Sequence, residues 1–404
     1  MHVLLIHQAF VSLDEPGGTR HHELARYLAN QGHRVTIIAS PISYLTGKSL
    51  REKISWSDKQ MDGDHICIIR AYTYPALHRS FAYRLVSFFS FMISSFAVGL
   101  GVKNVDLVWG TSPPIFQGLT AWALSRIKRV PLLFEVRDLW PAFAVAVGVL
   151  KNPVLIRLSE WLERFLYRHA NLVMVNSPGF IQHVQARGAR QVELVPNGTD
   201  TAMFNPDVDG SFFRELHQLT SKFIALYAGA HGLSNDLNVV LEAARELLPE
   251  KNIIFILLGD GKDKPALQNQ AIEQGLENVL FLPPIPKIEM PSALAAADAC
   301  IAILKPLDMY KTTYPNKVFD YMACGKPVVL AIDGVIREVI EKAGAGIAVL
   351  PGDPHALSQA ILYLSQQPNL AHNMGKRARK YVEDHFDRNL LASQLMSIMR
   401  GMIE

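Results

Sequence analysis

Cysteine is scarce in this sequence of 404 residues, and its spacing excludes two classes of protein. The three cysteines, Cys67, Cys300 and Cys324, lie far apart and are odd in number. They therefore form neither a disulfide framework nor the paired C-x-x-C spacing of a structural zinc or redox site. A reducing cytosol fits this pattern best.

Three motifs that would indicate a cofactor or a metal are incomplete. Gly259-Asp260-Gly261 and Gly344-Ala345-Gly346 each lack the third glycine of the dinucleotide fingerprint G-x-G-x-x-G, which disfavours an NAD enzyme. His21-His22-Glu23 lacks the H-E-x-x-H spacing of a zinc site. Asp62-Gly63-Asp64 precedes a strand and is interpreted as a turn rather than a chelating pair. No metal site is predicted.

The sequence begins MHVLLIHQAF, without a basic segment ahead of the apolar run, and we expect a first strand rather than a signal peptide. The net charge of +3 conceals an uneven distribution. Residues 1–200 carry 21 Lys and Arg against 14 Asp and Glu, whereas residues 201–404 carry 19 against 23. A basic half without Lys/Arg-rich runs argues against nucleic acid as a partner but suits an anionic membrane or a phosphorylated substrate. Uneven surface composition is the alternative explanation.

Apolar runs of strand length alternate with helical segments along the chain. The runs HVLLIHQ, HRVTIIAS, ICIIRAY, VDLVWG, PLLFEV, LVMVNS and VELVPN are separated by candidate helices that include residues 115–128, 153–169 and 179–187. This alternation predicts a parallel, doubly wound sheet that is covered on both faces. Turn residues then gather in VPNGTDTAMFNPDVDG, residues 195–210, which indicates a domain boundary.

Beyond that boundary the alternation resumes with FIALYAG and predicts a second domain of the same kind. The predicted fold class is α/β, with Rossmann-like domains over residues 1–200 and 201–385. Two such domains in tandem would face each other across a deep cleft at the carboxyl ends of their strands. Residues 386–404 are predicted to form a terminal helix that packs back toward the N-terminal domain.

One stretch is unusually apolar: SFAYRLVSFFSFMISSFAVGL, residues 80–100, with Arg84 as its only charge. It is long enough to span a bilayer, but serines dilute it and the strand–helix alternation resumes directly after it. A membrane-spanning helix and a helix buried in the protein remain open as alternatives. We favour a surface helix that dips into the membrane, with contact through residues 78–100, because Arg79 and Arg84 suit an interface.

Two loops are candidate anion sites. In Glu15–Arg20 the glycines Gly17 and Gly18 let backbone amides approach a ligand ahead of a helix, although a flexible loop would need them equally. In YPNKVFDYMACGKPVV, residues 314–329, Asn316 could cap a helix whose first amides point at an anion. Lys317 adds charge there, and Asp320 lies on the same side of the helix, a pattern that amphipathicity alone would also explain.

These segments resemble retaining, nucleotide-sugar-dependent glycosyltransferases of the GT-B fold, in family 4 (group 1). The resemblance covers nearly the whole chain and rests on PGGTRHHELARYLANQGHRVTIIAS, VPNGTDTAMF, YAGAHGLSNDLNVVLEAA, ILLGDGKDK, YPNKVFDYMACGKPVV and GVIREVIEKAGAGIAVLPGD. The segments FEVRDLWPAFAVAVGVLKNP and LERFLYRHANLVMVNSPGF resemble a branch used in O-antigen, capsule or exopolysaccharide assembly. The resemblance implies that the N-terminal domain holds the acceptor and the C-terminal domain the nucleotide sugar, expected to be a UDP-sugar.

The resemblance also implies roles for single residues. Asp320 matches the second acid of the family's E-x7-E motif, which holds the ribose, whereas the first acid position is Thr312. The family's Arg and Lys that grip the diphosphate are absent from the start of the second domain, and Lys317, Lys311 or His231 would substitute. The other expected nucleotide-binding residues are Gly17, Gly18, Gly229, Gly259, Gly261, Pro284, Ile285, Tyr314, Pro315 and Asn316.

The predicted mechanism uses no metal and no resident cofactor. Helix N-termini, loop amides and cations stabilise the leaving diphosphate, and attack from the same face retains the configuration. Asp138 is the predicted catalytic carboxylate, with a structural pair to Arg137 as the alternative; His21 and His22 are weaker candidates.

The expected reaction transfers a sugar from the nucleotide sugar to a polyprenyl-diphosphate-linked saccharide at the inner face of the cytoplasmic membrane. An N-acetylated amino sugar is one candidate for the transferred sugar. Two alternatives stay open: a nucleotide-sugar 2-epimerase on the same fold, and a non-catalytic sugar-nucleotide-binding protein.

Overall fold

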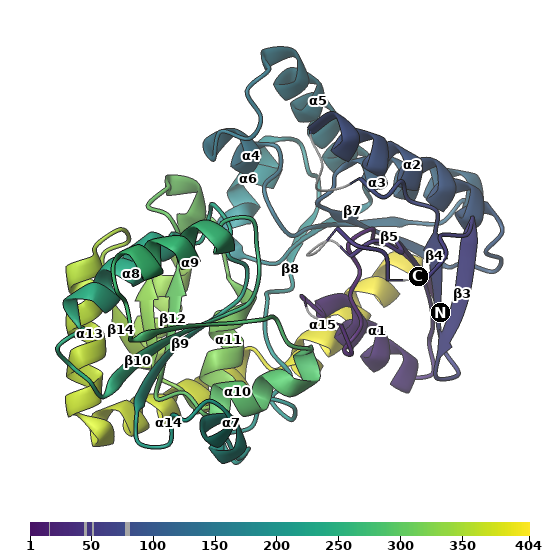
Figure 1. The fold of residues 1–404 in the computed structure, drawn as a ribbon. Coiled ribbons are helices and arrows are strands. Elements are labelled where there is room, and N and C mark those ends of the chain that lie inside the picture. The colour runs from purple at the N-terminus through teal and green to yellow at the C-terminus, as the bar shows by residue number, and fades with distance from the viewer. Residues whose placement is uncertain (16, 44–46, 51, 77–80) are drawn as a thin grey trace. The chain divides into compact units, whose positions relative to one another are not determined.

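The computed structural model describes residues 1–15, 17–43, 47–50, 52–76 and 81–404. The chain divides into two compact units. The first comprises Met1–Ser12, Gly18–Pro196 and Asn389–Glu404, and the second comprises Leu13–Gly17 and Asn197–Arg388. Each unit has its own sheet with helices on both faces (Figure 1). The predicted α/β class with two doubly wound sheets is therefore confirmed.

The first unit contains a sheet of eight strands in the order β3-β4-β2-β1-β5-β6-β7-β8. The strands are β1 (His2–Ile6), β2 (Arg34–Ala39), β3 (Ser57–Asp62), β4 (Ile66–Ala71), β5 (Leu107–Ser112), β6 (Leu132–Val136), β7 (Leu172–Val175) and β8 (Val192–Leu194). All neighbours pair in parallel except β3 and β4. The sequence SDKQMD of β3 is polar because β3 is an exposed edge strand, and for this reason the apolar pattern did not predict it.

Helices cover both faces of this sheet. They are α1 (Arg20–Asn30), α2 (Phe81–Leu100), α3 (Phe116–Lys128), α4 (Ala142–Ala146), α5 (Pro153–His169), η1 (Pro178–Phe180), α6 (Ile181–Ala186) and α15 (Arg388–Ile403). In Figure 1, α2, α3 and α5 lie on one face of the sheet, and α1 and α15 lie on the other. Burial of both faces explains why the strands are apolar throughout rather than alternating.

The C-terminal helix α15 supplies part of the core of the first unit. Leu391, Leu395 and Met399 follow one another at helical spacing and are buried. They share a hydrophobic cluster with Val3 and Leu5 of β1. The last segment of the chain thus packs against the first strand.

The second unit contains six parallel strands in the order β11-β10-β9-β12-β13-β14. They are β9 (Phe223–Ala228), β10 (Ile253–Leu258), β11 (Val279–Leu282), β12 (Ala299–Ile303), β13 (Val328–Ala331) and β14 (Gly346–Ala348). Alternate residues of β9 enter two separate cores: Ile224 and Leu226 one, Ala225 and Tyr227 the other. Both faces of the second sheet are therefore buried as well.

Ten helical segments of the second unit are described around this sheet. They are α7 (Ser211–Leu216), α8 (Leu237–Glu246), α9 (Lys264–Glu273), η2 (Lys287–Glu289), α10 (Met290–Ala295), η3 (Asp308–Thr312), α11 (Asn316–Ala323), α12 (Val335–Ala343), α13 (Pro354–Gln366) and α14 (Pro368–His385). Strand order in both sheets reverses beside the first strand of the unit: β1 lies between β2 and β5, and β9 lies between β10 and β12. Ligands of open α/β sheets bind at such points, beyond the carboxyl ends of the strands.

The apolar segment predicted to contact a membrane forms α2, although residues 78–80 lie outside the described residues. The window Tyr83–Leu100 is long and apolar enough to cross a membrane by length and composition, and 33% of it is buried inside the structure. Phe91 is buried, whereas Val86, Phe89 and Ile93 are exposed. Within the first unit α2 is therefore a half-buried surface helix with an apolar outer face.

Truncation of Leu395 should destabilise the first unit. Leu395 is 0% exposed, and replacing a buried leucine with alanine leaves a cavity that costs about 2–5 kcal/mol. Leu390→Ala on the same helix is the control, since Leu390 is 51% exposed and its loss should cost about 0.5 kcal/mol or less. Urea unfolding of the two variants and the parent chain measures the difference, and equal effects from both would contradict the packing of α15.

Candidate functional site

Three segments meet at the carboxyl edge of the second sheet, and glycine makes their approach possible. Gly229 follows β9 with φ +150°, and a Cβ there would lie 2.5 Å from Nζ of Lys317. A Cβ on Gly259, after β10, would lie 1.9 Å from the carbonyl oxygen of Gly229. A Cβ on Gly261 would lie 2.2 Å from the carbonyl oxygen of His231. Backbone atoms block a Cβ at Gly259 and Gly261, and the positive φ of Gly229 strains any other residue, so backbone lies beside the lysine ammonium.

Lys317 is the second residue of α11 and has no carboxylate partner among the described residues. Its Nζ lies 3.9 Å from the centroid of the Tyr227 ring, a cation–π contact. Burial lowers the pKa of the Lys317 ammonium to about 7. A desolvated cation of this kind gains free energy when an anion binds next to it. Sequence reasoning missed Tyr227, whose signal is an aromatic residue near the end of a buried strand.

His231 is wholly buried beside Lys317, and neither of its ring nitrogens has a hydrogen-bond partner within the described part of the chain. Burial lowers the pKa of its imidazole to about 4, and the charges of Lys264 and Lys317 act in the same direction. The neutral ring still has one N–H to donate. An unsatisfied buried donor is typical of a site where a ligand supplies the missing bond.

Asp320 is buried on α11 and already has partners. Its Oδ2 lies 2.6 Å from Nζ of Lys287, and its Oδ1 accepts a hydrogen bond of 2.7 Å from Oγ1 of Thr199. These bonds tie α11 to η2 and to the segment that opens the second unit. Lys287 and Thr199 are remote in sequence, so no local pattern indicated them. The ribose-binding role of Asp320 stays a prediction.

The predicted cap of α11 is wrong. Pro315 occupies the N-cap position and Asn316 is the first helical residue, so Asn316 cannot accept the capping bonds. Its Oδ1 instead lies 3.4 Å from Nη2 of Arg388. Tyr314 is half-buried, and its carbonyl oxygen accepts a hydrogen bond from Nδ2 of Asn197. The loop ahead of α11 is thus fixed by contacts within the second unit.

The other predicted donor residues lie in nearby loops. Lys311 is exposed and pairs with Asp308, with 2.7 Å between Nζ and Oδ1. Thr312 donates a hydrogen bond from Oγ1 to a backbone carbonyl of the same turn. Pro284 and Ile285 follow β11 and are half-buried. Because Lys311 is solvated and paired, Lys317 is the better candidate to hold a diphosphate.

In the first unit, Glu135 of β6 binds the start of α1. Its Oε1 lies 3.0 Å from Nε of Arg20, and its Oε2 lies 2.6 Å from Nε2 of His21. Burial alone would raise the pKa of Glu135, but His21 and Arg20 hold it well below its ordinary value. Burial also lowers the pKa of His21 to about 4. A neutral His21 that donates to an ionised Glu135 is a structural arrangement, and the sequence signal was a lone acid in an apolar strand.

Asp138 follows β6 at the carboxyl edge of the same sheet. Burial raises the pKa of its carboxyl group to about 7, although Arg137 and the backbone N–H of Leu139 act in the opposite direction. Arg137 donates a hydrogen bond of 2.7 Å from Nη2 to the carbonyl oxygen of Pro113. A carboxyl group with this pKa can exchange a proton near neutral pH, as a general base must. The predicted catalytic role of Asp138 is chemically feasible and stays a prediction.

His22 and the first glycine loop are less suited to catalysis. His22 is buried, and its Nε2 lies 2.5 Å from Oδ2 of Asp62 at the end of β3, so it links α1 to the edge strand. Gly17 has φ +144° and belongs to the second unit, whereas Gly18 belongs to the first. A Cβ on Gly18 would meet nothing within 4 Å, so no close approach requires a glycine there. Pro16 of this loop lies outside the described residues.

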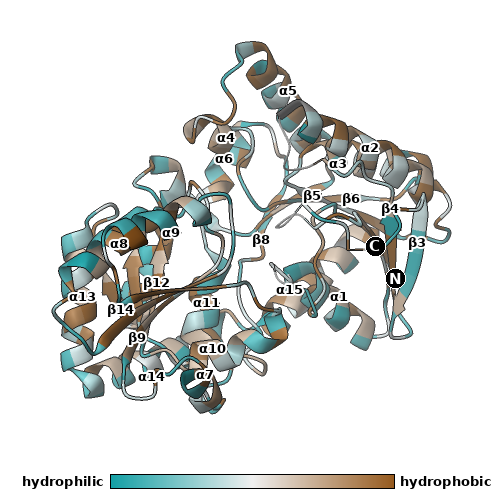
Figure 2. Ribbon diagram, viewed as in Figure 1, coloured by the Kyte–Doolittle hydropathy of each residue, from teal (hydrophilic) through white to brown (hydrophobic). Residues whose placement is uncertain are grey.

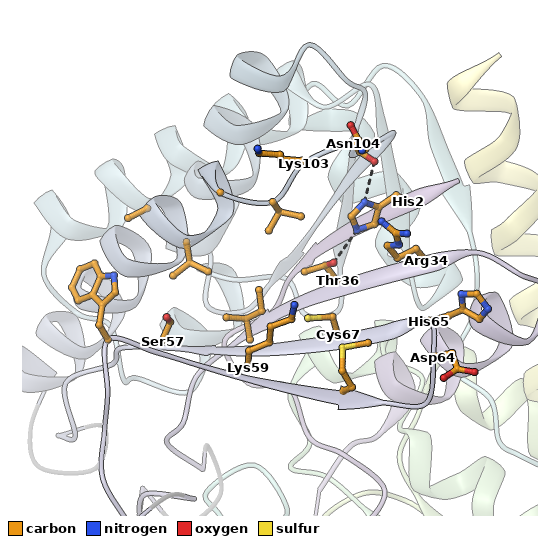
Figure 3. A pocket seen from close by; sticks show the side chains of 17 residues that line it. His2, Arg34, Thr36, Ser57, Lys59, Asp64, His65, Cys67, Lys103 and Asn104 are labelled. Atoms are coloured by element: carbon orange, nitrogen blue, oxygen red, sulfur yellow. Dashed lines mark hydrogen bonds between the residues drawn. The ribbon is translucent and has the colours of Figure 1, made fainter.

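A cavity of about 780 Å³ lies at the amino ends of the strands of the first sheet, opposite the carboxyl edge near Asp138 (Figure 3). His2 and Arg34 line it at the amino ends of β1 and β2, and His65 and Asn104 line it from the loops that precede β4 and β5. His2 is fixed there by hydrogen bonds to the Asn104 carbonyl oxygen (2.9 Å) and to Oγ1 of Thr36 (2.8 Å). None of the predicted site residues borders this cavity, and the catalytic edge of such a sheet is the opposite one.

Within the described ranges, no group of three or more His, Cys, Asp or Glu side chains is arranged to hold a metal ion. The three cysteines are all buried and free. Burial raises the pKa of the Cys324 thiol to about 12, so this thiol is not a reactive nucleophile.

Comparison with known families settles which proteins the chain is related to. Residues 17–198 match the family described as glycosyl transferase 4-like domain, and residues 211–381 match the family described as glycosyl transferases group 1. The chain is a glycosyltransferase of the GT-B type, with a glycosyl transferase 4-like domain followed by a group 1 domain. It is 25% identical over 392 residues to a protein named as the colanic acid biosynthesis glycosyl transferase WcaI of Escherichia coli (strain K12), which covers 94% of this chain and 95% of WcaI.

Solved structures show the same fold. Sucrose-phosphate synthase from Thermosynechococcus elongatus superimposes on the transferase with a TM-score of 0.81 at 19% identity, covering 99% of this chain and 98% of that one. Anabaena HepE in complex with UDP-glucose gives a TM-score of 0.71 at 18% identity, and the match covers 99% of this chain and 100% of the HepE chain. At these identities the likeness shows the fold alone, and it confirms the predicted GT-B class.

Binding of a nucleoside diphosphate to the transferase should take up protons at a pH of about 8. Lys317, whose pKa is about 7, is then mostly neutral, and a bound diphosphate raises this pKa and charges it. The complex is thus favoured at low pH, and affinity should fall as the pH rises above 7. Calorimetric titration with UDP in buffers of different ionisation enthalpy measures the uptake.

Lys317→Met should abolish most of this uptake and weaken UDP binding by about tenfold or more, since a charged hydrogen bond is lost. Lys311→Met is the matched control and should preserve both, because Lys311 is exposed and already paired. Unchanged proton uptake in Lys317→Met would exclude Lys317 from the diphosphate site.

Proposed function

We propose that this GT-B glycosyltransferase is a retaining, metal-independent enzyme that uses a UDP-sugar. It transfers the sugar, with an N-acetylated amino sugar as the first candidate, to a polyprenyl-diphosphate-linked saccharide in cell-surface polysaccharide biosynthesis. The observation that carries the proposal is Lys317, a partly buried cation that no described carboxylate neutralises. The naming of WcaI for colanic acid biosynthesis supports a polysaccharide product, and HepE in complex with UDP-glucose supports a uridine donor.

The second unit is suited to stabilise the leaving group. When the bond between the anomeric carbon and the phosphate oxygen breaks, its electron pair stays on the diphosphate as negative charge. Lys317 supplies a compensating cation, the N-terminus of α11 supplies the positive end of the helix dipole, and His231 supplies one more donor. Gly229 and Gly259 leave room for the phosphates to reach them. Donors already in place need no reorganisation as charge develops, which is how such a site lowers the barrier.

The first unit is suited to present the acceptor. Its hydroxyl oxygen attacks the anomeric carbon from the face that the diphosphate leaves, so the new bond has the configuration of the old one. The hydroxyl proton passes to the carboxylate of Asp138 or to the departing phosphate. Asp138 is favoured because its pKa of about 7 allows it to be ionised before the reaction and protonated after it.

A place at the inner face of the cytoplasmic membrane belongs to the same proposal. The acceptor is a lipid, and the outer face of α2 exposes Val86, Phe89 and Ile93 without an intervening charge. Such a face gains free energy by burying its apolar surface at a bilayer interface. The enzyme would then be cytoplasmic and peripheral to the membrane.

The direct test incubates the purified chain with UDP-[14C]N-acetylglucosamine, a polyprenyl-diphosphate-linked sugar and a chelator. The proposal expects label in the lipid fraction, and an anomeric configuration by NMR that matches the donor. An epimerised nucleotide sugar formed without acceptor would identify a 2-epimerase instead. Donor binding without any product would identify a non-catalytic sugar-nucleotide-binding protein, and turnover that stops with the chelator would contradict metal independence.

Asp138→Asn should lower kcat by about 100- to 10,000-fold, the usual contribution of a general base. In the parent chain kcat should rise with pH through about 7, because only the ionised carboxylate accepts a proton and burial has raised its pKa to that value. The rise should be absent from the variant. Asp64→Asn, at an exposed carboxylate in the turn after β3, is the control. A variant with normal kcat and an unchanged pH profile would assign the proton to the departing phosphate.

A further inference from the structure

The helix α5 exposes large apolar side chains on a face that no described residue of the first unit covers. Val154, Leu158 and Trp161 are 60%, 57% and 59% exposed, and their spacing of four and three residues places them on one side of the helix. Leu162 and Leu166 are buried on the other side. Single exposed apolar residues are common, but a row of three that includes a tryptophan indicates a binding surface.

The exposed face cannot turn inward, because the opposite side of α5 is bonded to other parts of the first unit. On the inner side the buried carboxylate of Glu163 lies 2.7 Å from Nη1 of Arg187 and 2.9 Å from Nε2 of His183. Rotation of the helix would break these bonds and leave a buried charge unpaired.

Positive charge flanks the apolar row. Arg157, Arg164 and Arg168 are exposed along α5, and within the described structure Arg157 and Arg168 have no ion-pair partner. Arg164 lies 3.7 Å from Glu160, a half-buried carboxylate that also lies 3.6 Å from Arg187. The face therefore has excess positive charge beside exposed tryptophan, leucine and valine. Such a face fits the boundary between lipid headgroups and acyl chains of an anionic membrane.

The apolar surface continues onto the segment before α5. Val145, at 39% exposure, lies in α4, and Val149, at 45%, lies in the loop that follows it. Figure 2 colours the ribbon of α4 largely as hydrophobic. The segment that connects β6 to α4 and α5 passes through Asp138 shortly after β6 ends. In a parallel sheet, a crossover helix starts at the carboxyl edge, so Val154 lies near the edge that carries Asp138. A membrane that contacts α4 and α5 would hold a lipid-linked acceptor next to that edge.

We propose that the outer face of α5, formed by Val154, Arg157, Leu158, Trp161, Arg164 and Arg168, docks on an anionic lipid membrane. Trp161 and Leu158 insert among the headgroups, and the arginines contact lipid phosphates. The apolar face of α2 has Arg84 as its only charge, so α5 supplies the preference for anionic lipid. The purpose of the docking rests on the proposed transfer to a lipid-linked acceptor, but the docking itself needs no turnover.

The test measures flotation of the full-length chain with vesicles of phosphatidylcholine, alone or mixed with phosphatidylglycerol. The parent chain should bind the mixed vesicles and not phosphatidylcholine alone. Trp161→Ser and the double variant Arg157→Gln/Arg168→Gln should each weaken binding by about tenfold or more. Ile272→Ser, at a 78% exposed isoleucine of α9, and Lys342→Gln, at an exposed lysine of α12, are the matched controls and should bind as the parent does.

Parent-like binding by both α5 variants, together with loss of binding in Phe89→Ser, would assign the docking to α2 and overturn the proposal. A lipid-free dimer that Trp161→Ser converts to a monomer would show that the face binds a second copy of the chain, and would also overturn it. Transfer to a water-soluble acceptor analogue separates this proposal from the function. The α5 variants should retain that activity, whereas its absence from the parent chain would count against the proposed reaction and leave the vesicle result intact.

Discussion

The proposed donor site of the second unit depends on one lysine ammonium that has no carboxylate partner among the described residues. Lys317 lies at the start of α11 with its charge over the Tyr227 ring, and Gly229 leaves no side chain between the ammonium and the strand ends. The burial that lowers its pKa to about 7 also makes an incoming diphosphate the natural partner. The proposed donor site, its independence of metal and its preference for low pH all follow from this single uncompensated charge.

Two buried carboxylates of the described chain, Asp320 and Glu135, are paired, unlike Lys317. Asp320 has Lys287 and Thr199, and Glu135 has Arg20 and His21. Removal of either carboxylate would leave an unpaired partner in the core, so Glu135 holds α1 to β6, and Asp320 holds α11 to η2 and to the segment around Thr199. Lys317, His231 and Asp138 instead have pKa values displaced mainly by burial. Groups that remain desolvated at the carboxyl edge of a sheet are those expected to bind or react.

The sequence predicted what depends on local pattern. Apolar runs located the buried strands, and the bounds of α5 were predicted at 153–169. It missed what depends on contacts between distant segments. The polar edge strand β3 has no apolar period, and the bonds of Asp320 to Lys287 and Thr199 join residues far apart in the chain. Asn316 was misassigned as a cap because the helix begins one residue after Pro315.

The most direct test of the central claim is a crystal structure of the chain with a bound UDP-sugar. The account predicts that a phosphate oxygen lies within hydrogen-bond distance of Nζ of Lys317, with the diphosphate against the backbone of Gly229 and Gly259 at the start of α11. A diphosphate bound away from α11, or held by a metal ion between carboxylates, would contradict it.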